Sequence, residues 1–261
     1  MNLPFVNGLH SEWLKTRRSL SAWLVVVGSL FTPVVVVIVR LVHRDKLPAI
    51  YAADNFWNLL WRNSWESMAI FFLPMGAILA TSLLTQIEYK NNTWKQVHVL
   101  PLSLTTLFFS KLAVILLLLV QFLILFSVGI YLSGVIPCLL VGGVPYPAAP
   151  IPYELFLRED GLFFVDCLPI VALQYLISLR FKNFLVPVGT GFVMWVGALA
   201  ALSWKFSYVV PYTYCMINYL KAKPDGKVAI PDFNFHAVAV GYFLLFTIAG
   251  YGLFVTKKEK G

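Results

Sequence analysis

Long apolar stretches alternate with short polar ones along the sequence. Runs of about 20 apolar residues, the length that crosses about 30 Å of hydrocarbon, predict six spanning helices, at residues 20–42, 65–87, 104–135, 161–179, 184–204 and 237–255. The third run is longer than a crossing needs, and the fourth is short and contains Asp166 and Pro169. We therefore expect an all-α polytopic membrane protein in which residues 1–261 form a single transmembrane domain.

Composition agrees with this class. Hydrophobic residues make up 59% of the chain, charged residues only 12%, and the mean hydropathy is +0.79. A soluble domain carries about 25% charged residues, so a soluble protein is excluded. The net charge of +8 is explained by basic flanks that face anionic lipid, and no nucleic-acid partner is needed.

The distribution of Lys and Arg predicts the orientation. If the N-terminus is cytoplasmic, the basic residues on that side crowd into short segments such as 15–18, 90–95 and 180–182. Those on the other side lie in longer loops together with acidic residues. The positive-inside rule then places both termini in the cytoplasm, which in a bacterium means a multi-pass protein of the cell (inner) membrane.

The first 19 residues precede the first predicted span. Phe5, Leu9 and Trp13 recur every four residues, whereas Asn7, Ser11, Lys15 and Arg18 fall on another face. This pattern is typical of an amphipathic helix that lies in the membrane interface. We expect residues 1–19 to form an interfacial elbow helix, and the alternative is a frayed basic tail.

A compact polar segment, residues 88–103, separates the second and third predicted spans. Thr93 and Gln96 form a capping box, since each side chain reaches the backbone amide of the other residue, so a short helix should begin there. Pro101 biases Leu100 out of helical geometry and should end that helix within about two turns. Ser103 is then placed to cap the third span.

The predicted short helix is amphipathic. Its apolar face carries Trp94, Val97 and Leu100, and its polar face carries Asn91, Lys95 and His98. Local chemistry alone leaves two interpretations open. The helix contacts a partner at the membrane surface, or it is a connector whose Trp94 anchors at the lipid interface, as tryptophans commonly do.

Motifs of catalysis are absent from the sequence. It has no phosphate-binding loop, no His-Glu-x-x-His and no Gly-x-Ser-x-Gly. The four histidines are scattered over predicted loops and surface helices, and Cys138, Cys167 and Cys215 have no metal-ligand spacing. Whether two of these cysteines form a disulfide is left open. We expect a non-catalytic chain without metal or cofactor.

Few ionisable residues lie inside the predicted spans, where they are expensive and usually functional. Glu66 is at a span edge, Lys111 is close enough to snorkel to the cytoplasmic face, and only Asp166 is deep. The glutamines Gln86, Gln121 and Gln174 are expected to bridge helices. An ion-coupled secondary carrier that uses Asp166 therefore remains an alternative function, and a membrane scaffold or sensor without transport is another.

The polar segment resembles a known family. Glu88, Thr93-Trp94-Lys95, Leu100-Pro101-Leu102-Ser103 and Lys111 are similar to the loop between the second and third spans in permease subunits of type-2 ABC transporters. The likeness extends over most of the chain and is greatest to the lantibiotic-immunity and bacitracin-resistance permeases. The stretch 136–152 departs from the family because it is longer and more apolar, and a re-entrant element there is one interpretation.

The resemblance implies a function and partners. The chain would be the permease subunit of an ATP-driven exporter, partnered by an ABC ATPase dimer that binds ATP and Mg²⁺, by a second permease chain and by membrane lipid. The segment 88–103 would be a cytoplasmic coupling helix, with ATPase contacts at Glu88, Asn91, Thr93, Trp94, Lys95, Val97, His98 and Pro101.

The segment between the last two predicted spans is rich in tyrosine. Tyr208, Tyr212, Tyr214 and Tyr219 suggest an aromatic belt at the membrane interface, and the resemblance implies short helices that dip into the outer leaflet. The apolar outer half and the branch resemblance together imply an amphipathic peptide antibiotic or a lipid-like molecule as substrate.

Overall fold

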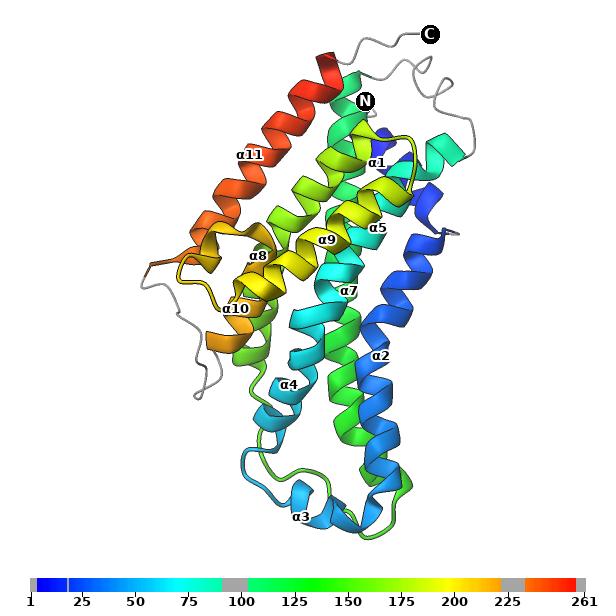
Figure 1. Cartoon of the computed structure of the whole chain (residues 1–261). Helices are drawn as coiled ribbons and strands as arrows, with labels where there is room; N and C mark the ends of the chain where they lie inside the picture. The colour runs from blue at the N-terminus through cyan, green and yellow to red at the C-terminus, as the bar shows by residue number, and fades with distance from the viewer. Residues whose placement is uncertain (1–3, 18, 91–102, 222–232, 257–261) are drawn as a thin grey trace.

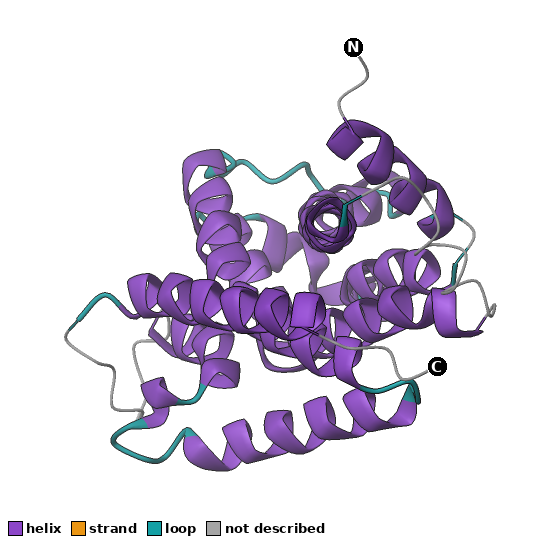
Figure 2. Ribbon diagram, turned by 90° about the horizontal axis from the view of Figure 1, so that it is seen from above, coloured by secondary structure: helices purple, strands orange, loops and turns teal. Residues whose placement is uncertain are grey.

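The computed structural model describes residues 4–17, 19–90, 103–221 and 233–256. All regular secondary structure in these ranges is helical, and the described part contains no strand (Figure 2). The main helices are α1 (Pro4–Thr16), α2 (Leu20–Val42), α4 (Phe56–Ser67), α5 (Leu73–Lys90), α7 (Leu104–Leu140), α8 (Tyr153–Arg180), α9 (Leu185–Ala201), α10 (Tyr214–Lys221) and α11 (Phe235–Thr256). The predicted all-α membrane class is confirmed.

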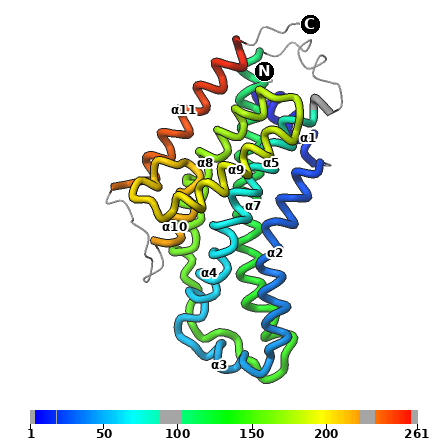
Figure 3. The backbone as a smooth tube through the Cα atoms, in the orientation of Figure 1, coloured from blue at the N-terminus to red at the C-terminus, as the bar shows by residue number. Residues whose placement is uncertain are grey.

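Short elements connect these helices. At one end of the bundle, η1 (Arg44–Lys46) and α3 (Leu47–Tyr51) join α2 to α4. A π-helical turn, η2 (Met68–Phe72), continues α4 into α5, and η3 (Ser207–Val209) and η4 (Pro211–Thr213) precede α10. The tube in Figure 3 follows the chain along α2 to α3 and back through α4 and α5.

Within the part of the chain that the structure describes, five stretches are long and apolar enough to cross a membrane. They are Leu20–Val42, Phe56–Ile87, Leu104–Leu140, Tyr153–Arg180 and Phe235–Thr256. The first has the bounds of the first predicted span. The fifth predicted span, 184–204, corresponds to α9, which has 17 residues and is therefore only about 26 Å long at 1.5 Å per residue.

Several helices run beyond the predicted spans. The second span begins at Phe56 instead of residue 65, the third ends at Leu140 instead of 135, and the fourth begins at Tyr153 instead of 161. A search for apolar runs stops at polar residues such as Arg62 and Glu159. The backbone hydrogen bonds of a helix do not depend on side-chain polarity, so these helices continue beyond the apolar runs.

The stretch 136–152 consists of a helix end and a loop. Its first residues complete α7, and the remainder is an irregular connection to α8. The indole Nε1 of Trp57 donates to the carbonyl oxygen of Ala149 at 3.0 Å, which fastens the connection to α4.

Helix α7 forms the centre of the bundle, because it packs against α1, α2, α4, α5, α8 and α11. In Figure 1, α1 and the C-terminal end of α11 lie at the same end of the molecule, and α3 lies at the opposite end. The ring of Phe122 on α7 packs against two glycines, Gly28 of α2 and Gly76 of α5. A Cβ atom added at Gly28 would lie 3.2 Å from the Cε2 atom of Phe122, and one added at Gly76 would lie 3.3 Å from it. Small residues thus allow α2 and α5 to approach α7 closely.

Candidate functional site

The predicted coupling segment lies between the end of α5 and the start of α7. Glu88 belongs to the last turn of α5, and its side chain is not among those described. The other predicted contact residues, which are Asn91, Thr93, Trp94, Lys95, Val97, His98 and Pro101, lie outside the described residues. Their roles stay predictions, and the structure describes the helix ends on either side of them.

Helix α7 begins with the predicted cap. The Oγ of Ser103 accepts a hydrogen bond from the backbone N–H of Thr106 at 3.1 Å, and the backbone of Ser103 is extended, with φ −66° and ψ 148°. Satisfying a free N–H group in the first turn stabilises the helix start. Helix α7 therefore begins immediately after the predicted coupling segment.

Helix α1 packs against the first turns of α7. Gly8, Glu12 and Thr16 are its buried residues, and a Cβ at Gly8 would lie 3.1 Å from the Cγ2 atom of Thr106. Within the predicted apolar stripe, Phe5 is 42% exposed, but Leu9 and Trp13 pack against the core. The side chains of α1 that face α7 are thus small or polar. Of the apolar residues Phe5, Leu9 and Trp13, only Phe5 is free to face lipid.

A buried carboxylate joins α1 to α7. Glu12 is 3% exposed, its Oε1 forms an ion pair with Lys15, and its Oε2 lies 3.7 Å from the Nζ of Lys111. The prediction that Lys111 snorkels to the surface is wrong, since this residue is 7% exposed. Sequence reasoning missed Glu12, although Gly8, Glu12 and Thr16 recur every four residues and so share a helix face.

Replacing Glu12 by glutamine is expected to lower the free energy of unfolding by about 1.5–3 kcal/mol, the range for hydrogen bonds to charged groups. The change keeps the shape of the side chain but removes the charge that faces two ammonium groups. Unfolding of the purified chain in mixed micelles measures the effect. Asp54→Asn, at an exposed position, is the matched control and should change stability by less than about 0.5 kcal/mol. If the two substitutions lowered the free energy of unfolding equally, the buried ion pairs of Glu12 would be contradicted.

Further hydrogen bonds connect the helix ends on either side of residues 91–102. The Nε2 of Gln86 on α5 donates to the carbonyl oxygen of Phe181, in the turn between α8 and α9, at 2.7 Å. The hydroxyls of Thr105 on α7 and Tyr251 on α11 are 2.7 Å apart. A displacement of α5 or α7 at this end therefore acts directly on α8, α9 and α11.

Asp166, the deep carboxylate on α8, has a partner that the sequence did not reveal. Its Oδ1 lies 2.7 Å from the Nδ1 of His236 at the start of α11. Asp166 is fully buried, and its Oδ2 has no hydrogen-bond partner among the described residues. The last predicted span begins one residue after His236, and the separation of 70 positions between the two residues leaves no local signal of the pair.

The tyrosine-rich segment is largely interior. Tyr212, Tyr214 and Tyr219 are at most 2% exposed, so their assignment to a belt at the lipid surface is wrong. Two of the buried phenol groups donate hydrogen bonds to side chains. Tyr212 donates to the Oε1 of Gln174 at 3.2 Å, and Tyr219 donates to the Oε2 of Glu66 at 3.1 Å.

The three cysteines are free thiols in the structure.

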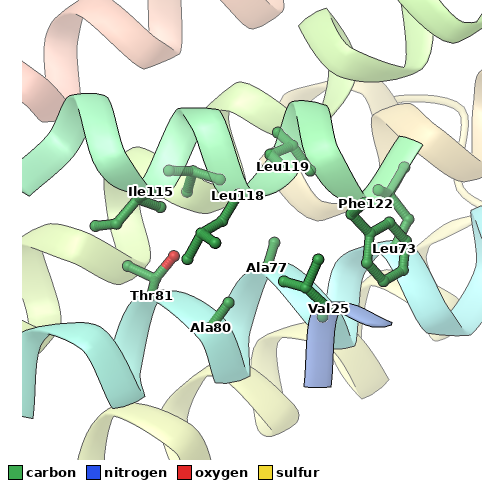
Figure 4. Close-up of a pocket in the computed structure, with 11 residues that line it drawn as sticks. Val25, Leu73, Ala77, Ala80, Thr81, Ile115, Leu118, Leu119 and Phe122 are labelled. Carbon is green, nitrogen blue, oxygen red and sulfur yellow. The ribbon is translucent and has the colours of Figure 1, made fainter. Parts of the chain in front are cut away.

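A small hollow lies between α2, α5, α7 and α8 (Figure 4). Thr81 is the one polar side chain among its lining residues, and the empty space is about 280 Å³, its open side included. Binding pockets for small molecules usually have about 300–1,000 Å³ and several placed polar groups. The hollow is therefore too small and too apolar for a peptide or a lipid headgroup.

The fold and these joints define a multi-pass helical membrane protein. A family model described as "ABC-2 family transporter protein" matches residues 9–198, from α1 to near the end of α9. The match covers more than half of the chain, so the chain belongs to the ABC-2 family of transporter proteins. Membership supports a permease role in the membrane, and such permeases are typically paired with an ATPase subunit. Neither a curated protein nor a solved structure matches the chain.

Proposed function

We propose that the chain is the transmembrane subunit of an ATP-driven exporter and couples to a separate ATPase dimer through the segment 88–103. The observation that carries this proposal is the family match. The helix ends beside the segment support it, because the capped start of α7 holds α1 through Glu12 and Lys111, and the end of α5 holds the α8–α9 turn. A force applied to the segment would reach all of these helices.

The proposed coupling helix meets the ATPase with two kinds of contact. Trp94 and Val97 fill an apolar groove in the partner, and the polar face of Asn91, Lys95 and His98 pairs with groups at its rim. Thr93 and Pro101 set the start and the end of the helix, and Glu88 supports the joint from α5. ATP and Mg²⁺ belong to the partner chain, and this chain hydrolyses nothing.

We further propose six crossings, with α9 as the fifth and α1 as an interfacial elbow on the cytoplasmic side of the bacterial inner membrane. The positions of α1 and of the end of α11 support this topology, because two termini at one end require an even number of crossings (Figure 1). The short α9 would cross with local thinning of the bilayer.

A second permease chain would complete the transport path. One face of α9 supports this arrangement, since a Cβ at Gly189 or Gly197 would meet nothing within 4 Å and Val193 between them is 69% exposed. Small residues on an open face permit close contact between helices in lipid.

The proposed substrate is an amphipathic peptide antibiotic or a lipid-like molecule, as in the lantibiotic-immunity and bacitracin-resistance branch. It would be expelled outward or drawn from the leaflet. The many exposed apolar residues of α2, such as Val34, Ile38 and Val42, support access from lipid.

Co-expression with the ATPase encoded beside the gene tests the proposed function. The wild-type chain should copurify with this ATPase. The double variant Trp94→Ala, Lys95→Glu should bind at least about 30-fold more weakly, which corresponds to the loss of one interface hot spot. A Trp-Lys pair in the outer segment, Trp204 and Lys205, offers a matched control because both residues are exposed, and Trp204→Ala, Lys205→Glu should leave binding unchanged. Failure of the wild-type chain to bind the ATPase would refute the proposal.

The Asp166–His236 pair favours one second candidate, an ion-coupled carrier. A buried carboxylate with one oxygen unpartnered among the described residues is a group that could take up a proton during transport. Gradient-driven uptake by the chain alone in proteoliposomes, abolished by Asp166→Asn, would support this function. Transport that requires nucleotide and the ATPase would exclude it.

A further inference from the structure

We propose that Gln174 is the positioning residue that transmits movement of α5 to the outer segment 206–221, through Ser82 on one side and Tyr212 on the other. The proposal rests on the proposed function, because it assigns the residue that carries the force of the coupling segment across the membrane. It adds a role for a side chain in the middle of α8 that contacts neither the coupling segment nor a ligand.

The side chain of Gln174 joins four elements. Its Nε2 donates to the Oγ of Ser82 on α5 at 2.9 Å and to the carbonyl oxygen of Pro187 on α9 at 2.5 Å. Its Oε1 accepts from the hydroxyl of Tyr212 on η4 at 3.2 Å. Gln174 and Ser82 are fully buried, and Tyr212 is 1% exposed. Both amide N–H groups and the carbonyl oxygen are therefore in use.

The hydrogen bonds of Gln174 are costly to break because they are buried. Removing a hydrogen bond from a polar group in an apolar interior destabilises the fold, because no water replaces the lost partner. Burial raises the pKa of the Tyr212 phenol, so this hydroxyl stays protonated and remains a donor at any physiological pH. The link between α8 and η4 is thus independent of pH.

The inner side of the link leads to the coupling segment. Ser82 lies eight residues before the end of α5 at Lys90, a distance of about 12 Å along a helix. One turn after Ser82, Gln86 makes the second bond, to the carbonyl oxygen of Phe181. Since α5 leads directly into the segment, it cannot slide along α8 without straining both bonds.

Gly191 on α9 leaves room for the side-chain amide of Gln174, because it has no Cβ atom. A Cβ at this position would lie 2.8 Å from the Oε1 of Gln174 and 2.7 Å from the Cγ2 of Ile78. Any larger residue would push the amide away from Tyr212 or α9 away from α5. The glycine therefore allows Gln174 to contact α9 and η4 together.

On the other side of Gln174, Tyr212 belongs to a segment whose residues are hydrogen-bonded to one another. Thr213, next to Tyr212, donates to the carbonyl oxygen of Ser207 at 2.8 Å, and Tyr214 donates to the carbonyl oxygen of Tyr208 at 2.7 Å. The residues from 207 to 214 are thus bonded to one another, and a shift of Tyr212 moves them as one.

Hydrogen exchange of the complex with its ATPase tests the proposal. In the wild-type complex, trapping with ATP and vanadate should change the exchange rates of amides in 103–111 and in 206–221 by about fivefold or more, which is a typical coupling between sites. Tyr212→Phe, which removes one hydroxyl, should abolish the change in 206–221 and keep the change in 103–111. Gln121→Leu is the control, because the structure gives this other mid-span glutamine no hydrogen bond among the described residues. A change in 206–221 that persists in Tyr212→Phe would overturn the proposal.

A double-mutant cycle on the isolated chain in lipid nanodiscs separates the link from the proposed function. Ser82→Ala and Tyr212→Phe each remove a different partner of Gln174, and their combined effect on the unfolding equilibrium constant should differ from the product of the single effects by about twofold or more. Effects that simply multiply would overturn the link whether or not an ATPase binds. If the cycle shows coupling but no ATPase binds the chain, the proposed function fails and the role of Gln174 in it fails as well.

Discussion

Replacing Trp65 by alanine is expected to lower the free energy of unfolding by about 3–5 kcal/mol, the range for large buried aromatic residues. Trp65 is fully buried near the end of α4. Its ring stacks on Phe163 of α8 at 3.8 Å between centroids and meets the edge of Phe126 of α7 at 5.1 Å. The substitution leaves a cavity where three spans meet, and the neighbouring helices can collapse into it only in part.

Trp23→Ala is the control for this prediction. Trp23 lies on α2 and is 67% exposed, so its removal should change stability by less than about 0.5 kcal/mol. Unfolding of both variants in mixed micelles provides the comparison. If Trp65→Ala is no more destabilising than Trp23→Ala, then α4, α7 and α8 do not pack as the structure describes.

Replacing Gly134 by alanine is expected to destabilise the chain by about 1–3 kcal/mol, as overpacking of a filled core does. A Cβ at Gly134 would lie 2.6 Å from the Cζ3 of Trp57. The indole has little freedom to move away, because Trp57 is 1% exposed, its Nε1 is bonded to Ala149, and its ring stacks on Tyr131. The clash outweighs the gain of about 1 kcal/mol that alanine brings to a helix interior.

Gly161→Ala on α8 separates these two contributions. A Cβ there would meet nothing within 4 Å, so only the gain in helix propensity remains and the variant should be as stable as the wild type or more so. Thermal unfolding of the two variants in lipid nanodiscs measures the difference. A stabilised Gly134→Ala variant would show that α4 and α7 are not in close contact at Trp57.

Local signals in the sequence predicted much of the fold. The apolar run 20–42 has the bounds of α2, Ser103 caps α7 as expected, and Gln86 and Gln174 bridge helices. The third predicted bridge, Gln121, makes no side-chain hydrogen bond among the described residues. Each of these predictions depends on neighbouring residues and on the cost of leaving a polar group unpaired in an apolar interior. The assignment to the family also followed from a local motif, and the match over residues 9–198 supports it.

Interactions between distant residues could not be predicted in this way. Nothing in the sequence near Lys111 or Asp166 indicates Glu12 or His236 as a partner. Tyrosines are common both at lipid interfaces and in cores, so the sequence alone could not show that Tyr212 and Tyr214 are buried. The extensions of α4 and α8 were missed because they are polar, although both continue as regular helices.

The contacts at this end of the bundle show which helices the proposed coupling segment, residues 88–103, would act on. Helix α7 is bonded to α1 and α11 at this end, and α5 is bonded to the α8–α9 turn. A push on one short segment would therefore act on the central helix and on the pair that leads to the outer segment. Under the proposed function the permease needs no nucleotide site of its own, because the ATPase partner would supply the force.

Cross-linking from position 94 tests the central claim most directly. A photoreactive amino acid placed at position 94, in cells that also make the neighbouring ATPase, should give a covalent product of the two chains after illumination. The same amino acid at position 204, in the exposed outer segment, should give none. A product from position 204 as strong as that from position 94, or no ATPase product from position 94, would contradict the account.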